Sequence, residues 1–221
     1  MTLIKICGLT NLADALVAAR AGADFLGFIF YPPSPRAANE ATVTAIVQQL
    51  RQEPHCPRLV GVFVNETAAT MAGVLDRCGL DLAQLHGDET PNLIGDPASP
   101  LYGRSYKVLK PASLAEAEAD MEWYLPPEPT PGNPTIMVDT PHPTLHGGTG
   151  EIADWSMAAA LAAGQPGVML AGGLTPDNVA EAIRQVHPFA VDVASGVEAR
   201  KGVKDLEKVR AFVGAVRAVS C

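Results

Sequence analysis

Leu3-Ile4-Lys5-Ile6-Cys7-Gly8-Leu9-Thr10-Asn11 is an apolar run that ends in a tight turn, and the helical pattern of residues 12–21 follows it directly. Asn11 is a typical N-cap for such a helix, and Gly22 is a typical stop. An open doubly wound sheet normally carries a G-x-G-x-x-G motif in the turn after its first strand, and this turn lacks it. The first unit therefore favours a closed barrel, with the open sheet as the alternative.

The same unit of apolar run, turn and helix recurs along all 221 residues. The predicted strands are residues 3–7, 25–30, 59–64, 82–86, 106–109, 136–139, 168–171 and 191–194. Eight units of about 28 residues have the length of a strand–helix–strand repeat, and near-continuous apolar runs are typical of parallel strands covered on both faces. We therefore predict an α/β fold in which residues 1–221 form a single-domain (β/α)8 TIM barrel.

Capping residues place the helices between these strands. The predicted helices are residues 12–21, 40–50, 68–77, 114–123, 154–163, 177–186 and 204–219. Ser113 and Glu116 form a predicted capping box, and Pro176 is the predicted first residue of its helix. Proline and glycine interrupt residues 89–104, so the fourth helix is predicted to be short or distorted, and residues 126–134 read as a stiff surface loop.

Composition narrows the classes of function. Lys and Arg number 16 against 24 Asp and Glu, a net charge of −8, and no basic patch indicates nucleic-acid binding. No apolar run approaches the roughly 20 residues of a membrane span. The first residues do not resemble a signal peptide, so we expect a cytoplasmic protein whose four cysteines are free thiols. No C-x-x-C pair indicates zinc, and no metal is expected.

In a barrel of this kind, active residues lie at the carboxyl ends of the strands. Cys7 ends the first strand and could act as a base or nucleophile if its pKa is lowered; a small core residue is the alternative. Asp139 ends the sixth strand after three apolar residues, and burial that raises its pKa would suit a general acid. A helix or loop cap is the alternative for Asp139.

Two further strand ends carry candidate binding residues. Three prolines stiffen the loop of residues 31–36 and present Arg36, whose guanidinium suits a carboxylate partner; a solvated arginine is the alternative. His86 is at the end of the predicted fourth strand and either lines the mouth or donates to a loop carbonyl. His142 and His146 lie in a glycine-rich segment that could fold over a ligand, and they lack a nearby third metal ligand.

Glycine turns follow the seventh and eighth strands, as Gly172-Gly173 and Ser195-Gly196. Loops after these two strands are the frequent phosphate site of barrel enzymes, because their backbone N–H groups can approach an anion closely. We therefore predict phosphate binding there, with simple tight turns as the alternative.

The ordered set of strand-end motifs resembles the phosphoribosylanthranilate isomerase family of tryptophan biosynthesis. The matching segments are residues 5–10, 22–28, 34–36, 61–65, 84–87, 138–140, 147–150, 171–174 and 195–198. The resemblance implies an isomerase without metal or organic cofactor that acts on a small phosphosugar substrate. It implies an Amadori rearrangement of N-(5-phosphoribosyl)anthranilate to 1-(2-carboxyphenylamino)-1-deoxyribulose 5-phosphate.

By the same resemblance, Cys7 is the general base, Asp139 the general acid and Arg36 the partner of the anthranilate carboxylate. The two glycine turns would hold the phosphate, although Ala194 stands where many relatives have Ser. Residues 90–104 and the longer loop at 126–134 depart from the family pattern. A monomer and a homodimer are both compatible with the sequence.

Two other functions stay open. Another phosphosugar barrel enzyme, an epimerase or indole-glycerol-phosphate synthase, would want metal ligands or a catalytic Lys and Glu at the strand ends. A non-catalytic barrel that senses a phosphorylated metabolite would have no need for both Cys7 and Asp139.

Overall fold

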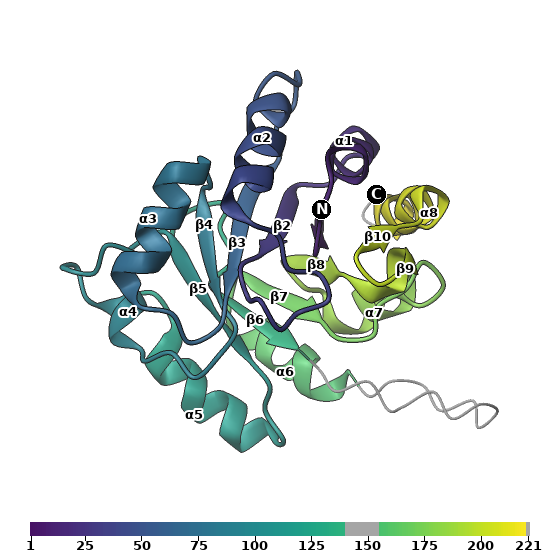
Figure 1. Cartoon of the computed structure of the whole chain (residues 1–221). Coiled ribbons are helices and arrows are strands. Elements are labelled where there is room, and N and C mark those ends of the chain that lie inside the picture. The colour runs from purple at the N-terminus through teal and green to yellow at the C-terminus, as the bar shows by residue number, and fades with distance from the viewer. Residues whose placement is uncertain (140–154, 220–221) are drawn as a thin grey trace.

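Eight parallel strands close into a barrel in the computed structural model, which describes residues 1–139 and 155–219 (Figure 1). The strands are β1 Leu3–Cys7, β2 Phe25–Ile29, β3 Arg58–Phe63, β4 Leu82–Leu85, β5 Ser105–Leu109, β6 Ile136–Asp139, β7 Val168–Ala171 and β8 Ala190–Val193. β1 pairs with β2 on one side and with β8 on the other. This closure confirms the predicted barrel and excludes the open sheet. His142, His146 and residues 147–150 lie outside the described residues.

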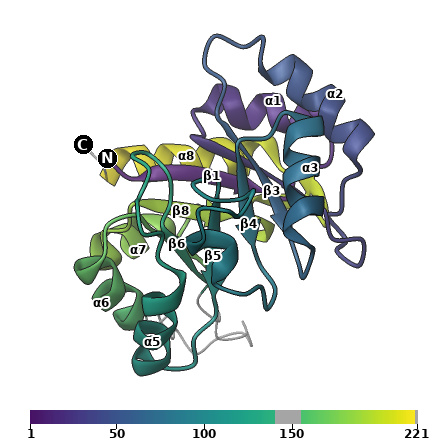
Figure 2. The ribbon, with the colours of Figure 1, turned by 90° about the vertical axis from the view of Figure 1, so that its left-hand side faces the viewer.

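Helices surround the barrel (Figures 1 and 2). They are α1 Leu12–Ala21, α2 Glu40–Leu50, α3 Ala68–Cys78, α4 Asn92–Gly95, α5 Leu114–Tyr124, α6 Ser156–Gly164, α7 Val179–Val186 and α8 Leu206–Val219. The predicted N-cap of α1 is confirmed, because Asn11 Oδ1 accepts a hydrogen bond from Asp14 N at 2.9 Å. Asn39 caps α2 in the same way, and its Oδ1 accepts from Thr42 N, also at 2.9 Å. Both helices have the predicted bounds.

The main core lies between the strands and the helices. Leu26, Phe28, Val43 and Phe212 are fully shielded there, and burying a side chain of this size stabilises the fold by roughly 1.5–3 kcal/mol. A smaller cluster fills the inside of the barrel, with buried side chains from β2 to β8 and with Leu3 of β1 packed against them. Its buried members are Phe25, Val60, Leu82, Tyr106, Val108, Met137, Met169, Ala171 and Ala190. This packing fills the part of the barrel that lies below the carboxyl ends of its strands.

Alternation along each strand decides which side chains enter the barrel. On β1, Lys5 and Cys7 face inward; Lys5 is in register with Asp192 of β8, and Cys7 is in register with Gly27 of β2. Gly27 has no side chain, and a Cβ there would come within 2.7 Å of Cys7 Sγ. The glycine therefore makes the room that the thiol occupies near the mouth.

The structure corrects the predictions near the carboxyl end of the chain. α7 begins at Val179 rather than at Asp177, and residues 175–178 form a turn in which Asn178 N donates to Thr175 O and Thr175 N donates to Asn178 Oδ1 at 2.8 Å. Pro176 is therefore not the first helical residue. α8 begins at Leu206, since Val203–Lys204 is a short strand, β10, paired with β9 Glu198–Arg200. Neither this hairpin nor the short 3-10 helix η1, Ser195–Val197, was predicted.

The capping box at α5 also differs in detail. Ser113 Oγ accepts from Glu116 N at 3.2 Å as predicted, but the Glu116 carboxylate accepts from Ala112 N at 2.9 Å rather than from the cap residue itself. As predicted, the fourth helix is short, with only the four residues of α4 between the prolines and glycines of that segment.

Candidate active site

A cavity of about 550 Å³ opens at the carboxyl ends of the strands. All eight predicted site residues line it: Cys7, Arg36, His86, Asp139, Gly172, Gly173, Ser195 and Gly196. For the two strand residues Cys7 and Asp139, period-two alternation explains this, because Cys7 lies two positions after the interior Lys5 and Asp139 two positions after the interior Met137. The structure thus brings residues from six different strand ends to one pocket of a size that suits a small molecule.

Cys7 is at the pocket wall, with only 5% of its surface exposed. Burial raises the pKa of its thiol, and the nearby ammonium of Lys5 opposes that rise. A lowered pKa was expected from the sequence for a base at this position. In the protein without ligand, the pKa of the Cys7 thiol is raised instead. The cause is the loss of hydration of a thiolate in an apolar wall.

Asp139 is half-buried at the end of β6 and faces the same pocket. Burial raises the pKa of its carboxyl group, the charge of Asp192 raises it further, and Lys110 and Lys5 act in the opposite direction. This direction matches the expectation for a general acid. A carboxyl group that holds its proton to higher pH can donate it where an ordinary aspartate could not.

His86 is held by a short chain of hydrogen bonds inside the barrel. The buried Tyr106 hydroxyl donates to Gln84 Oε1 at 2.9 Å, and Gln84 Nε2 lies 3.1 Å from His86 Nδ1. Burial lowers the pKa of His86 to about 4, so the ring is neutral at pH 7. A neutral ring that accepts at Nδ1 carries its proton on Nε2, and His86 can then donate that N–H to a ligand.

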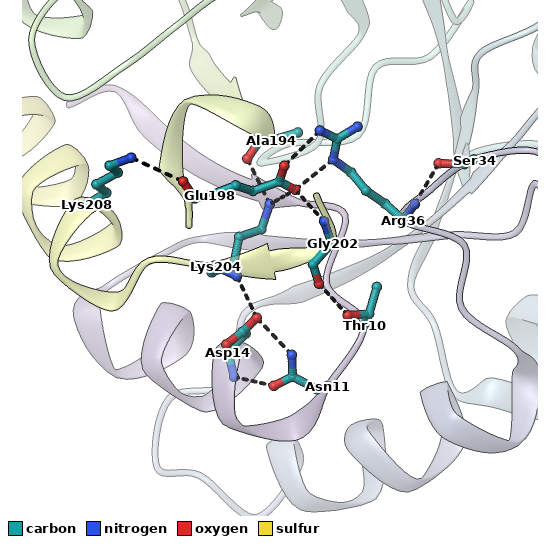
Figure 3. A network of polar contacts seen from close by, with 10 residues as sticks. All are labelled: Thr10, Asn11, Asp14, Ser34, Arg36, Ala194, Glu198, Gly202, Lys204 and Lys208. Atoms are coloured by element: carbon teal, nitrogen blue, oxygen red, sulfur yellow. Dashed lines mark hydrogen bonds and ion pairs between the residues drawn. The ribbon is translucent and has the colours of Figure 1, made fainter. Parts of the chain in front are cut away.

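Arg36 already forms an ion pair with a carboxylate of the protein. Its guanidinium donates from Nε to Glu198 Oε1 at 2.7 Å and from Nη2 to Glu198 Oε2 at 2.8 Å (Figure 3). Its backbone N–H also donates to Ser34 Oγ at 3.1 Å, which ties the proline loop to the arginine. Nη1 and one Nη2 hydrogen remain for another acceptor. The side chain is therefore fixed at the pocket wall by a protein carboxylate.

Glu198 is the centre of a buried network of polar contacts (Figure 3). It was not among the site residues predicted from the sequence. Lys204 Nζ lies 3.3 Å from Glu198 Oε1 and donates to Ala194 O at 2.8 Å. Burial by itself would raise the pKa of Glu198, but the hydrogen bonds from Arg36 and the charge of Lys204 hold it below its ordinary value. Glu198 is therefore ionised and links the arginine to the loop after β8.

The glycine turns form the wall beside β7 and β8. Gly172 and Gly173 have φ of 100° and 58°, in the left-handed region that favours glycine. A Cβ on Gly196 would lie 1.9 Å from Leu174 O, so these two loops touch through a position that only glycine fits. In the described part of the chain, the N–H groups of Gly172 and Gly173 donate no hydrogen bond to another turn or loop. They can therefore serve an anion.

Lys5 and Asp192 are further polar residues at the site that the sequence reading did not single out. The Lys5 ammonium is fully shielded and lies 2.8 Å from Asp192 Oδ1. Period-two alternation was the available signal, because Lys5 precedes Cys7 by two positions and so shares its face of the strand. Asp192 gave a weaker signal, a lone acid within the apolar run of β8.

The other cysteines were also predicted to be free thiols. Cys56 and Cys78, like Cys7, are free thiols, and Cys221 lies outside the described residues. Among residues 1–139 and 155–219, no three His, Cys, Asp or Glu side chains gather as metal ligands, and no helix in those ranges could cross a membrane. The absence of metal and cofactor stays a prediction.

This chain is similar to known proteins over nearly its whole length. The family described as N-(5'phosphoribosyl)anthranilate (PRA) isomerase matches residues 4–215. N-(5'-phosphoribosyl)anthranilate isomerase of Azotobacter vinelandii is 46% identical over 215 residues, which cover 96% of each chain. The crystal structure of the Thermotoga maritima isomerase covers 99% of this chain and 100% of its own, at 35% identity and a TM-score of 0.83.

A further solved structure holds a ligand. It is a phosphoribosylanthranilate isomerase in complex with reduced 1-(o-carboxyphenylamino)-1-deoxyribulose 5-phosphate, with 33% identity, a TM-score of 0.82 and coverage of 99% of this chain and 100% of that one. The closed barrel and the matching family together define the class of protein as a TIM-barrel isomerase. Within that class, the chain belongs to the phosphoribosylanthranilate isomerase family of tryptophan biosynthesis.

Proposed function

We propose that this chain catalyses the Amadori rearrangement of N-(5-phosphoribosyl)anthranilate to 1-(2-carboxyphenylamino)-1-deoxyribulose 5-phosphate, with Cys7 as general base and Asp139 as general acid. The observation that carries the proposal is that these two groups line one cavity, from β1 and β6, with glycine loops on the same wall. The family membership supplies the substrate, and the positions of the groups supply the roles.

The first step opens the sugar ring. Protonated Asp139 gives its proton to the furanose ring oxygen while the bond from C1′ to that oxygen breaks, and the anilino nitrogen provides the electron pair that forms a protonated Schiff base. A raised pKa of Asp139 supports this role, because the acid must hold a proton near neutral pH.

The second step moves a proton from carbon. The Cys7 thiolate removes the C2′ proton, the C1′–C2′ bond becomes double, and the electrons of the C=N bond return to nitrogen. The resulting enolamine becomes the keto product by proton transfer to C1′ and loss of the proton on the C2′ hydroxyl. Each proton transfer by a positioned group is typically worth about 10²–10⁴ in rate, or roughly 3–5 kcal/mol of barrier.

Three binding roles complete the proposal. Arg36 holds the anthranilate carboxylate with its remaining N–H groups, and His86 donates an Nε2–H to the substrate. Backbone N–H groups at Gly172, Gly173, Ser195 and Gly196 hold the phosphate. These contacts at the two ends of the substrate would fix the ribose between Cys7 and Asp139 and supply binding energy for positioning.

Two variants test the assignment directly. Cys7→Ser and Asp139→Asn should each lower kcat by about 10²-fold or more, the order typical of proton transfer, while urea unfolding stays close to that of the parent protein. Conversion of phosphoribosylanthranilate by purified enzyme measures turnover, and growth of a tryptophan auxotroph that lacks the isomerase checks it in cells. Parental turnover in either variant would rule out that residue's role.

The proposal extends to the domain organisation, the location in the cell and the oligomeric state. We propose that residues 1–221 form one catalytic domain that works in the cytoplasm as a monomer or homodimer. Gel filtration with light scattering distinguishes the two oligomeric states.

A further inference from the structure

The mechanism asks for opposite behaviour from two groups in one pocket. Cys7 must release its proton to act as a base, whereas Asp139 must keep its proton to act as an acid. With pKa values raised at both groups, burial helps the acid and hinders the base. Burial raises the pKa of both groups. Another feature of the interior must therefore lower the pKa of Cys7 without lowering that of Asp139.

The Lys5–Asp192 ion pair lies between them. Lys5 is on the strand that carries Cys7, two residues earlier on the same face, and its ammonium donates to Asp192 Oδ1 at 2.8 Å. The Cβ position of Gly27 is 2.7 Å from Cys7 Sγ and 3.2 Å from Lys5 Nζ. The ammonium is therefore within the roughly 4–6 Å over which a positive charge favours a thiolate.

Asp192, the carboxylate of the pair, lies on the side of the cavity that holds Asp139. Asp192 lines the cavity with Asp139, and β7 alone separates their strands. The residue of β7 in register with Asp139 is Ala171, whose small side chain leaves little between the two carboxyl groups. A negative charge on Asp192 disfavours a second negative charge on Asp139.

We propose that the Lys5–Asp192 ion pair is a positioning device for proton transfer, in which the ammonium stabilises a thiolate at Cys7 and the carboxylate keeps a proton on Asp139. The inference rests on the proposed roles of Cys7 and Asp139. The balance of charges agrees with it: after burial, Lys5 is the strongest influence on the pKa of Cys7 and lowers it, while Asp192 is the strongest on Asp139 and raises it.

Other charged groups also act on the two sites. Lys204 of β10 lowers the pKa of Cys7, Arg36 of the proline loop interacts with the thiolate, and Tyr106 of β5 interacts with both Lys5 and Cys7. Lys110 at the end of β5 lowers the pKa of Asp139. Because none of these groups spans the two sites, the ion pair is the element that can separate them.

The test measures the two groups independently of each other. In a parent protein with Cys56→Ser, Cys78→Ala and Cys221→Ser, the pH dependence of iodoacetamide alkylation gives the titration midpoint of Cys7 without substrate. Lys5→Met should raise that midpoint by about one unit or more, and Asp192→Asn should lower it by a similar amount, as expected for loss of a close charge. Opposite shifts from two neighbouring substitutions are a signature that general loss of packing does not produce.

The second readout is the titration midpoint of the Asp139 carboxyl group, followed by carbon-13 nuclear magnetic resonance. Asp192→Asn should move that midpoint to lower pH. The double variant Lys5→Met/Asp192→Asn leaves no unpaired buried charge, and it should move the Cys7 midpoint up and the Asp139 midpoint down. A matched control is Lys107→Met/Glu89→Gln, which removes a buried pair with a 2.9 Å contact outside the barrel and should shift neither.

The outcomes separate this inference from the proposed function. If Cys7→Ala abolishes turnover but Lys5→Met leaves the alkylation midpoint where it was, the ion pair has no role and the base assignment stands. If Cys7→Ala turns over normally, the proposed function fails whatever the midpoints are. Should Lys5→Met not fold, the double variant and Asp192→Asn decide the matter, since an unshifted midpoint in both overturns the inference.

Discussion

The guanidinium of Arg36 and the carboxylate of Glu198 form two parallel hydrogen bonds of 2.7 and 2.8 Å across 162 residues of sequence (Figure 3). Glu198 is 9% exposed and itself contacts Lys204. The pair fixes the plane of the guanidinium at the wall of the cavity before any ligand arrives. Such preorganisation favours binding because less side-chain freedom is lost in the complex.

Arg36→Ala should raise KM for phosphoribosylanthranilate with a smaller change in kcat. Losing charge-assisted hydrogen bonds of about 1.5–3 kcal/mol corresponds to roughly a 10–100-fold rise. Glu198→Gln keeps one acceptor for the guanidinium and should raise KM less. Arg77→Ala, at the exposed pair with Glu40, is the control and should leave KM unchanged. An unaltered KM in Arg36→Ala would place Arg36 outside the binding site.

Gly196→Ala should weaken phosphate binding. Its Cβ would come within 1.9 Å of Leu174 O, so one of the two loops must shift away from the pocket. We expect KM to rise by about 10-fold or more, the order of a lost contact to a charged group, and competitive inhibition by inorganic phosphate to weaken. Gly214→Ala is a matched control, because a Cβ at that position in α8 has no atom within 4 Å. Equal KM values for the two variants would contradict the phosphate assignment.

His86 should carry no charge between pH 5 and 8, because burial lowers its pKa to about 4. The unfolded chain takes up this proton first, at its ordinary pKa of 6.5, so protonation of His86 reduces the free energy of unfolding as the pH falls from 6.5 toward 4. Nuclear magnetic resonance titration of the imidazole measures the midpoint directly. Urea unfolding of His86→Gln should show a shallower loss of stability over the same range. A midpoint near 6.5 would refute the neutral-donor assignment.

Lys107→Met should destabilise the barrel by about 3–5 kcal/mol, the usual effect of leaving one member of a buried ion pair alone. Lys107 and Glu89 are 2.9 Å apart and almost fully buried, and Glu89 also accepts from Asn65 N at 2.9 Å. Lys107→Met/Glu89→Gln removes both charges and should recover part of the loss. Urea unfolding at pH 7 compares them, and equal stability of the single variant and the parent would show that the pair contributes nothing.

Local signals in the sequence were sufficient for the units of the fold. Asn11 and Asn39 mark the helices that they cap, and the apolar runs mark the strands to within a residue or two at each end. They failed at Thr175–Asn178, where the chain forms a turn before α7 begins at Val179.

The sequence by itself determined that Cys7 and Asp139 end strands of a repeating strand–helix pattern, since that follows from alternation and from the rule for strand ends. Only the closed barrel decided which charged side chains lie next to these two residues. Lys5 meets Asp192 from 187 residues away because β8 returns to pair with β1. Coulomb energy depends on distance and burial, and both are set by barrel closure rather than by spacing along the chain.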